Sequence, residues 1–167
     1  MSKLKLIATS SAIVSLLAAC GGGGDGPRIF GLAATGAAMA NASVVAKCAT
    51  GSPITGTTGA DGTFNLKIDE REAPCLIQVT KGSVVMHSFA TASGQINVTP
   101  LTDIVVAKAL GGRPADAFDT FNASTGKTIQ SGLAAAKTYA RNQITSLVGS
   151  APSGDLMTGS FKVGDAD

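Results

Sequence analysis

Residues 57–68, which read Thr-Thr-Gly-Ala-Asp-Gly-Thr-Phe-Asn-Leu-Lys-Ile, decide the fold of this chain. Ala60-Asp61-Gly62 predicts a tight reversal, because Asp and Gly tolerate the positive φ that hairpin turns require. After the turn, apolar residues at 64, 66 and 68 alternate with polar ones, which is typical of a strand with one buried face. The stretch therefore predicts a tight turn that leads into a half-buried strand.

Short β-type runs bounded by turn residues continue on both sides of this stretch. Cys75, Ile77 and Val79 give the second clear alternation of apolar and polar positions. Seven short strands with frequent turns indicate a mainly β fold, a seven-stranded sandwich over residues 28–100. The predicted strands cover residues 28–34, 42–48, 54–58, 63–68, 75–80, 83–90 and 94–98.

A small α-helical region is predicted at 101–149, after the strand pattern ends at a proline. Thr102 is the expected N-cap of its first helix, and Asp103 suits the positive end of the helix dipole. Further helices are expected at 114–121 and 128–148, and the last has an alanine-rich apolar stripe that predicts packing against protein. Residues 150–167 show weak signs of order and are predicted to form a tail.

The N-terminal residues predict export from the cytoplasm. Two lysines precede the apolar residues 6–17, as in a signal peptide, and this run is too short for a permanent membrane span. It ends in Leu-Ala-Ala-Cys at residues 17–20, which resembles the lipobox of bacterial lipoproteins. The resemblance implies removal of residues 1–19 as a lipoprotein signal peptide and lipidation of Cys20, whose acyl chains hold the protein to the membrane. The alternative is an ordinary secretory signal with an incidental cysteine.

The residues that follow Cys20 refine this expectation. Gly21 stands where an aspartate favours inner-membrane retention in Gram-negative lipoproteins, so the resemblance implies an outer-membrane lipoprotein, facing the periplasm or the cell surface. The Gly-rich residues 20–27 predict a flexible tether between the lipid headgroups and the folded domain. Residues 97–107, Asn-Val-Thr-Pro-Leu-Thr-Asp-Ile-Val-Val-Ala, resemble a stretch in a set of proteobacterial lipoproteins, and this resemblance implies that the chain continues beyond Asp167.

Export makes the two remaining cysteines, Cys48 and Cys75, interpretable. In an oxidising compartment, two cysteines in a small domain most simply form a disulfide. The alternative is a metal site, but it lacks partners because His87 is the only histidine, so neither a metal nor a cofactor is expected. Closing this loop would contribute roughly 3–4 kcal/mol to stability in the chain-entropy model.

Four short motifs in the β-rich part belong together: Gly31, Ala-Ser-Val-Val at 42–45, Thr-Thr-Gly-Ala-Asp-Gly-Thr-Phe at 57–64, and Leu-Ile-Gln-Val-Thr-Lys-Gly at 76–82. Over residues 28–98 they resemble the carboxypeptidase regulatory-like domain, a transthyretin-like sandwich. The resemblance implies that the strands holding Val44 and Ile77 run antiparallel, which would bring Cys48 close to Cys75. It also implies a domain without an active site of its own, an accessory to enzymes, transporters and surface proteins.

Motifs that suggest chemistry are each better explained by structure. Ser124 and Lys127 match the Ser-x-x-Lys pattern of serine β-lactamases, but the Ser-Asp-Asn and Lys-Thr-Gly elements of those enzymes are missing. Residues 126–128 mimic the end of a phosphate-binding loop without the buried strand that must precede it. The turn at Asp61 lacks the alternating oxygen ligands of a calcium loop. His87, in an alternating strand, is expected to be structural and partly buried or at the surface.

The charge of the chain excludes one class of function. Removal of the predicted signal peptide takes two lysines, which leaves 11 of the 13 basic residues and 11 acidic ones, so the mature chain is neutral. No basic surface for nucleic acid is therefore expected. We expect a lipid-anchored, non-catalytic cell-envelope module with a structural, adhesive or polymer-binding role, which reaches an envelope protein or glycan through exposed strand edges. The alternatives are an accessory or regulatory domain of an envelope hydrolase or transporter, and a hydrolase that uses Ser124 and Lys127.

Overall fold

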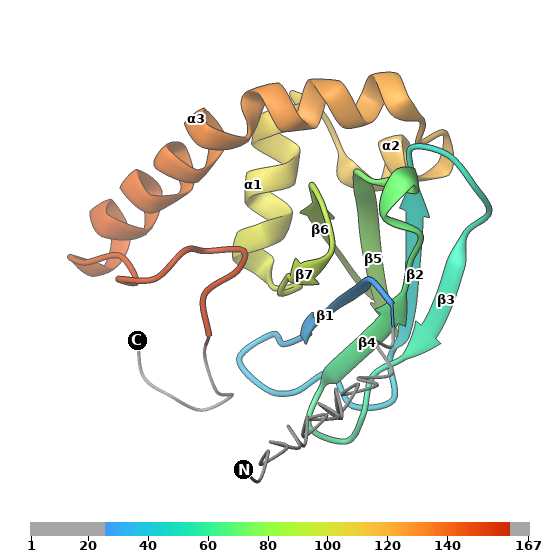
Figure 1. The fold of residues 1–167 in the computed structure, drawn as a ribbon. Helices are drawn as coiled ribbons and strands as arrows, with labels where there is room; N and C mark the ends of the chain where they lie inside the picture. The colour runs from blue at the N-terminus through green and yellow to red at the C-terminus, as the bar shows by residue number, and fades with distance from the viewer. Residues whose placement is uncertain (1–25, 161–167) are drawn as a thin grey trace, which may run out of the picture.

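The computed structural model describes residues 26–160, which form two β-sheets followed by helices (Figure 1). The predicted mainly β fold with a C-terminal helical region is confirmed. In the described part of the chain the strands are β1 (Arg28–Leu32), β2 (Ser43–Cys48), β3 (Ile54–Thr57), β4 (Thr63–Lys67), β5 (Cys75–Lys81), β6 (Val84–Ala90) and β7 (Gly94–Gln95). The helices are the short 3-10 helix η1 (Glu70–Glu72), α1 (Pro100–Leu110), α2 (Pro114–Asp119) and α3 (Ala123–Val148).

The strands divide into a three-stranded sheet, in the order β4-β1-β7, and a four-stranded sheet, in the order β3-β2-β5-β6. β1 lies in the middle of its sheet, antiparallel to β4 and parallel to β7. All neighbours in the four-stranded sheet run antiparallel. The register of β2 and β5 places Cys48 directly opposite Cys75.

The alternation predicted in β4 is confirmed and explains how the two sheets pack. Phe64 and Leu66 are buried, whereas Thr63, Asn65 and Lys67 between them are exposed. Residues of the other sheet meet these side chains from its inner face. Burial of apolar area at about 25 cal/mol per Å² drives this packing. The inner face of the four-stranded sheet contributes Val44, Ala46, Ile77, Val79 and Met86.

The tight turn before β4 forms as predicted. Asp61 accepts hydrogen bonds through Oδ1 from the backbone N and the Oγ1 of Thr63, at 3.0 and 2.7 Å. Gly62 adopts φ +82°, a conformation that glycine reaches without strain. A Cβ at Gly62 would also lie 2.6 Å from the carbonyl oxygen of Ala33. Both the backbone conformation and the lack of space therefore require glycine at this position.

The last predicted strand, 94–98, is regular only at Gly94–Gln95. Residue 97 causes the interruption, because the backbone N–H of Leu32 donates to the side-chain Oδ1 of Asn97, at 3.3 Å, and not to a carbonyl group of the neighbouring strand. Ile96 and Val98 still donate their N–H groups to carbonyl groups of β1. The chain therefore continues alongside β1, but a side chain occupies one step of the ladder.

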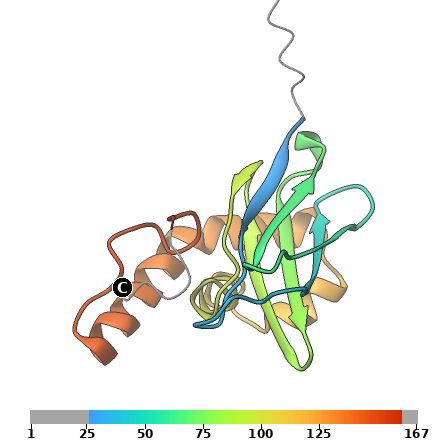
Figure 2. The ribbon, with the colours of Figure 1, turned by 90° about the horizontal axis from the view of Figure 1, so that it is seen from below.

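The helices pack beside the four-stranded sheet and leave the other sheet uncovered. Leu76 and Phe89 face away from the core between the sheets and are still only 0% and 1% exposed. Phe121 contributes to this second core, with its ring 6.5 Å from that of Phe89. In Figure 1, α2 and α3 lie above the strands and α1 stands beside β6, and Figure 2, seen from below, shows α3 passing behind the strands. The molecule is therefore layered, with helices on one side only.

Two predicted helix starts are wrong. Thr99, not Thr102, is the N-cap of α1, and Thr102 completes a reciprocal capping box with it three residues later. α3 starts at Ala123 and not at residue 128, because Asn122 accepts hydrogen bonds from the backbone N–H groups of Ser124 and Thr125, at 2.9 and 3.1 Å. In both cases the capping residue lies in a stretch that sequence reasoning assigned to the preceding loop.

Residues 150–160, part of the predicted tail, contain no helix or strand but pack against the rest of the fold. Leu156 and Met157 are buried, and Lys137 of α3 forms an ion pair with Asp155 at 2.8 Å. The carbonyl oxygen of Met157 accepts a hydrogen bond from the backbone N of Asn97 at 2.7 Å. The tail therefore covers the edge beside β7. Within residues 26–160, no helix has the length and apolar character needed to cross a membrane.

Candidate functional site

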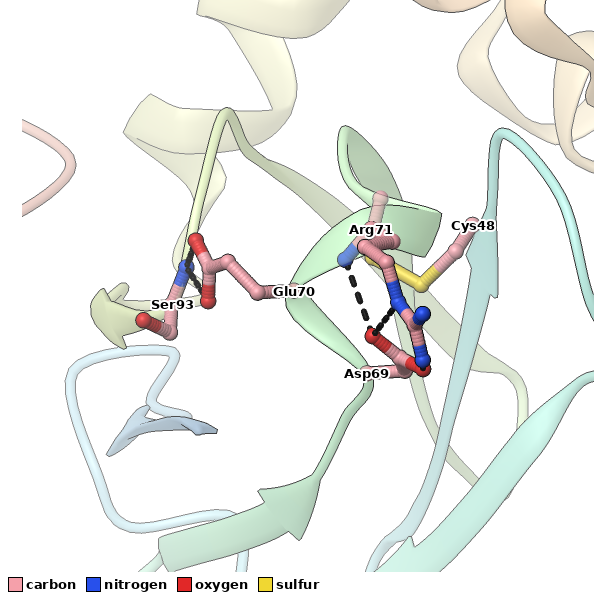
Figure 3. The surroundings of a disulfide bond; sticks show 6 residues. Cys48, Asp69, Glu70, Arg71 and Ser93 are labelled. Atoms are coloured by element: carbon pink, nitrogen blue, oxygen red, sulfur yellow. Dashed lines mark hydrogen bonds and ion pairs between the residues drawn. A yellow bond between two sulfur atoms is a disulfide. The ribbon is translucent and has the colours of Figure 1, made fainter. Parts of the chain in front are cut away.

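The predicted disulfide between Cys48 and Cys75 is present, and Figure 3 shows it beside η1. Its sulfur atoms are 1.98 Å apart, and both cysteines are buried at the paired ends of β2 and β5. The backbone N–H of Ala49, next to Cys48, donates to the carbonyl oxygens of Glu72 and Pro74. The disulfide therefore sits in a closed corner and acts as a structural cross-link.

Two carboxylates close the loop around this corner (Figure 3). Asp69 accepts from the backbone N and the guanidinium of Arg71, and these hydrogen bonds lower the pKa of its carboxyl to about 2. Glu70 accepts from the backbone N of Ser93 at 2.9 Å, and hydrogen bonds from Ser93 lower its pKa. Glu70 therefore joins the β4–β5 connection to the turn before β7.

His87 was expected to be partly buried or at the surface, but it is fully buried and held on several sides. Its Nδ1 lies 2.8 Å from Oδ1 of Asp103, and its Nε2 lies 3.0 Å from Nε2 of Gln78. Its ring lies 5.8 Å from that of Phe118. With an exposed fraction of 2%, the imidazole is out of reach of a substrate. The sequence indicated the structural role but not Asp103, because the partner comes from a helix.

Ser124 and Lys127 lie exposed in the first turns of α3. The capping hydrogen bonds from Asn122 account for the small polar residues at this helix start. The Asp61 carboxylate stabilises the turn by accepting a hydrogen bond from the hydroxyl of Thr63, and this bond lowers the pKa of the carboxyl. In the part of the chain that the structure describes, no three His, Cys, Asp or Glu side chains gather as metal ligands would. Cys20, the predicted lipidation site, lies outside the described residues.

An open groove lies on the three-stranded sheet, which the helices leave uncovered. Its volume is about 610 Å³. Phe30 of β1 lines it and is 43% exposed, although phenylalanine side chains are usually buried. The lining of the groove combines apolar, hydroxyl and amide side chains, among them Phe30, Leu32, Thr57, Thr63, Asn65 and Gln95.

The amide side chains of the groove are held in place by hydrogen bonds. Asn65 accepts from Nη1 of Arg28 at 3.3 Å. Gln95 and Asn97 both donate to the carbonyl oxygen of Gly159, at 3.2 and 2.6 Å, so the tail fixes one wall. Sequence reasoning missed this site, although a signal existed: Phe30 is out of phase with the buried apolar residue Ile29 beside it.

No family model matches the chain, and comparison with curated proteins and with solved structures finds no match either. The function of the chain therefore has to be inferred from its own residues. Besides the groove, the C-terminal end of α3 carries the most exposed apolar side chains of the described region, Leu147 at 82% and Val148 at 72%. Two neighbouring exposed apolar side chains at a helix end offer a contact for another molecule.

Proposed function

We propose that this chain is a lipid-anchored, non-catalytic binding module of the cell envelope, held in the outer membrane through acyl chains on Cys20. The observation that carries the binding role is the asymmetry of the layers: helices cover one sheet, and the other presents a groove with an exposed Phe30. An outward-facing aromatic residue over an open groove supports recognition of an envelope polymer, such as a glycan.

The disulfide supports the proposed location. Cystine bonds persist in oxidising compartments outside the cytoplasm, and Cys48 and Cys75 are joined. The lipobox resemblance at residues 17–20 supports the anchor, and the first described strand begins at Arg28, directly after the proposed Gly-rich tether. A tether of this length keeps the module within roughly 30 Å of the bilayer surface.

The transthyretin-like assignment is part of this proposal. It is supported by the division of seven strands into sheets of three and four, and by the antiparallel pairing of β2 with β5. In this assignment the regulatory-like domain is followed by a helical region, and the domain has no active site of its own.

A second candidate is an accessory or regulatory domain of an envelope hydrolase or transporter. The exposed Leu147 and Val148 favour it, because apolar side chains at a helix end can pack into a protein partner. In that case the partner would co-purify with the chain, and the variant carrying Leu147→Ser and Val148→Ser would lose it. In the leading proposal the same variant would keep its envelope ligand.

Intact-mass measurement of the protein extracted from its native membrane tests the anchor. We expect a chain that begins at Cys20, carries a diacylglyceryl group, and gains two hydrogens on reduction of Cys48–Cys75. The matched control is Cys20→Ser, which cannot be acylated and should be released from the membrane fraction. An unmodified mass for the unaltered chain would sink the proposed anchor and location.

A further inference from the structure

We infer that the groove on the three-stranded sheet binds an uncharged oligosaccharide, with Phe30 as the stacking platform and Asn65 and Gln95 as the polar contacts. This inference rests on the proposed role as a binding module, but it does not depend on the lipid anchor. It names a site and a ligand class on the face that the helices leave open.

The first step concerns the aromatic ring. Phe30 is 43% exposed on the middle strand of the sheet, between Asn65 of β4 and Gln95 of β7 in the strand register. A sugar ring presents a flat face of C–H groups, and such a face covers an aromatic ring while its hydroxyl groups stay at the rim. Aromatic rings bury a large area at low entropic cost, so one ring can anchor a ligand of this shape.

The second step concerns charge. Among the described residues, the groove is lined by apolar, amide and hydroxyl side chains and by no charged one. Amides both donate and accept hydrogen bonds, and hydroxyls do the same. These groups match a ligand that offers a donor and an acceptor at each hydroxyl and carries no net charge. A charged ligand would meet no group of opposite charge among the lining residues, and Arg28 beside them donates to Asn65.

The third step argues against an extended peptide as the ligand. A peptide that binds as an added strand needs an open sheet edge with unpaired backbone groups. The groove opens on the face of the sheet over β1, which is paired with β4 on one side and β7 on the other, and it extends across the edge strand β4 to Thr57 of β3. β4 contributes the side chains of Thr63 and Asn65 to this lining. The tail covers the far edge of β7 through the hydrogen bond from Asn97 to Met157. The sheet face therefore offers side chains rather than backbone.

The fourth step concerns preorganisation. Gln95 and Asn97 donate to the same carbonyl oxygen, that of Gly159, and Asn65 is held by Arg28. Side chains fixed in this way lose little entropy when a ligand binds. Within residues 26–160, the NH₂ group of Asn65 and the hydroxyl of Thr57 make no hydrogen bond, so both remain available to a ligand. The volume of about 610 Å³ lies within the range of ligand sites.

The test is an NMR titration of the full chain with soluble uncharged oligosaccharides, using oligomers of glucose and of N-acetylglucosamine as probes. The detergent must be zwitterionic and free of sugar, because a maltoside headgroup would compete for the groove. We expect amide shifts at Phe30, Asn65 and Gln95. Phe30→Ala should weaken binding about tenfold, and Phe30→Tyr should retain it. The matched control is Val85→Ala, which shortens an equally exposed apolar residue on β6 and should leave binding unchanged.

Several outcomes would overturn the inference. One is that no probe shifts the groove residues, and another is that Phe30→Ala binds as well as the unaltered chain. Binding of charged sugars or of peptides alone would assign the groove to another ligand class. Sugar binding that appears only after removal of residues 161–167 would mean that the groove holds the chain's own C-terminal segment. The mass of the acyl group on Cys20 is measured separately. Failure of sugar binding at the groove and failure of the proposed lipid anchor can therefore be told apart.

Discussion

A single carboxylate oxygen, Oδ1 of Asp103, lies 2.8 Å from both the backbone N and the Nδ1 of His87. The carbonyl oxygen of His87 accepts from Oγ1 of Thr102 at 2.9 Å. β6 is an edge strand of its sheet, and these contacts occupy backbone groups that would otherwise face outward. At His87, the start of α1 therefore blocks this edge from pairing with another chain.

Loss of this contact should destabilise the fold. Asp103→Ala leaves the buried N–H groups of His87 without an acceptor, so we expect the free energy of unfolding to fall by about 1–3 kcal/mol. Asp103→Asn keeps an oxygen acceptor and should cost less. Urea unfolding measures both. Asp116→Ala is the control, since its ion pair with Arg113 spans 3.9 Å at an exposed site and should contribute almost nothing. Equal losses for Asp103→Ala and Asp116→Ala would contradict the role of Asp103.

The disulfide should account for a large part of the stability. It closes a loop with a sequence separation of 27, which corresponds to about 3.5 kcal/mol in the chain-entropy model. Replacement of both Cys48 and Cys75 by Ala should lower the free energy of unfolding by this order. The variant also serves as the control for reduction. A reductant should lower the free energy of unfolding of the unaltered chain and leave that of the variant unchanged. If the reductant lowered the free energy of unfolding of both proteins equally, the disulfide would not be the group through which it acts.

Gly132 should resist replacement, although alanine is the better helix former. A Cβ at this position of α3 would lie 2.7 Å from the carbonyl oxygen of Ala109, in the packed contact with α1. The clash should outweigh a helix-propensity gain of about 1 kcal/mol and give a net loss of about 1–2 kcal/mol. Ser131→Ala, at the exposed neighbouring position, should be neutral or stabilising in the same thermal unfolding experiment. A similar gain for Gly132→Ala would show that α1 and α3 are not in close contact here.

The tail should loosen in acid. Burial raises the pKa of Asp155, but hydrogen bonds from Lys137, Met157 and Thr158 outweigh it and lower the pKa from 3.8 to about 2. A carboxyl with a lowered pKa stabilises the fold above its unfolded value, and this contribution is lost as the pH falls from about 4 to about 2. Asp155→Asn should therefore cost about 1 kcal/mol at neutral pH, since the ion pair is partly exposed.

The comparison that checks this is the difference in thermal stability between the unaltered chain and Asp155→Asn at a series of pH values. The difference should shrink between about pH 4 and pH 2, where Asp155 becomes protonated. Because other carboxylates titrate in both proteins, only the difference reports Asp155. A gap that stays constant down to pH 2 would rule out the proposed ion pair.

Most of the sheet structure could be predicted, because period-two alternation and turn residues are local signals. Phe64 and Leu66 face the core as the alternation requires, and Asp61 forms its turn from neighbours two residues away. The pairing of Cys48 with Cys75 followed from export and from the family resemblance, and the β2–β5 register places the two opposite each other.

What could not be predicted depends on contacts distant in the sequence. The order of residues 150–160 comes from Met157 against Asn97 and from Asp155 against Lys137, and no local pattern announces such contacts. Asn122 as the start of α3 was missed because capping competes with loop formation in the same residues. The groove was missed because Phe30 is one more apolar residue in the strand pattern. Its phase against Ile29 places it on the outer face, and the layer order shows that nothing in the described chain covers that face.

The central place of β1 in its sheet has a mechanical consequence. β1 is the first strand of the described chain, and it is bonded to β4 on one side and to β7 on the other. Hydrogen bonds between antiparallel strands lie perpendicular to the strand direction. A force that pulls on the N-terminal end of β1 therefore loads the β1–β4 ladder in shear, so its bonds share the load and do not open one after another. If the proposed anchor at Cys20 holds the chain, tension from that side would act on β1 in this direction, and the domain would resist being pulled apart.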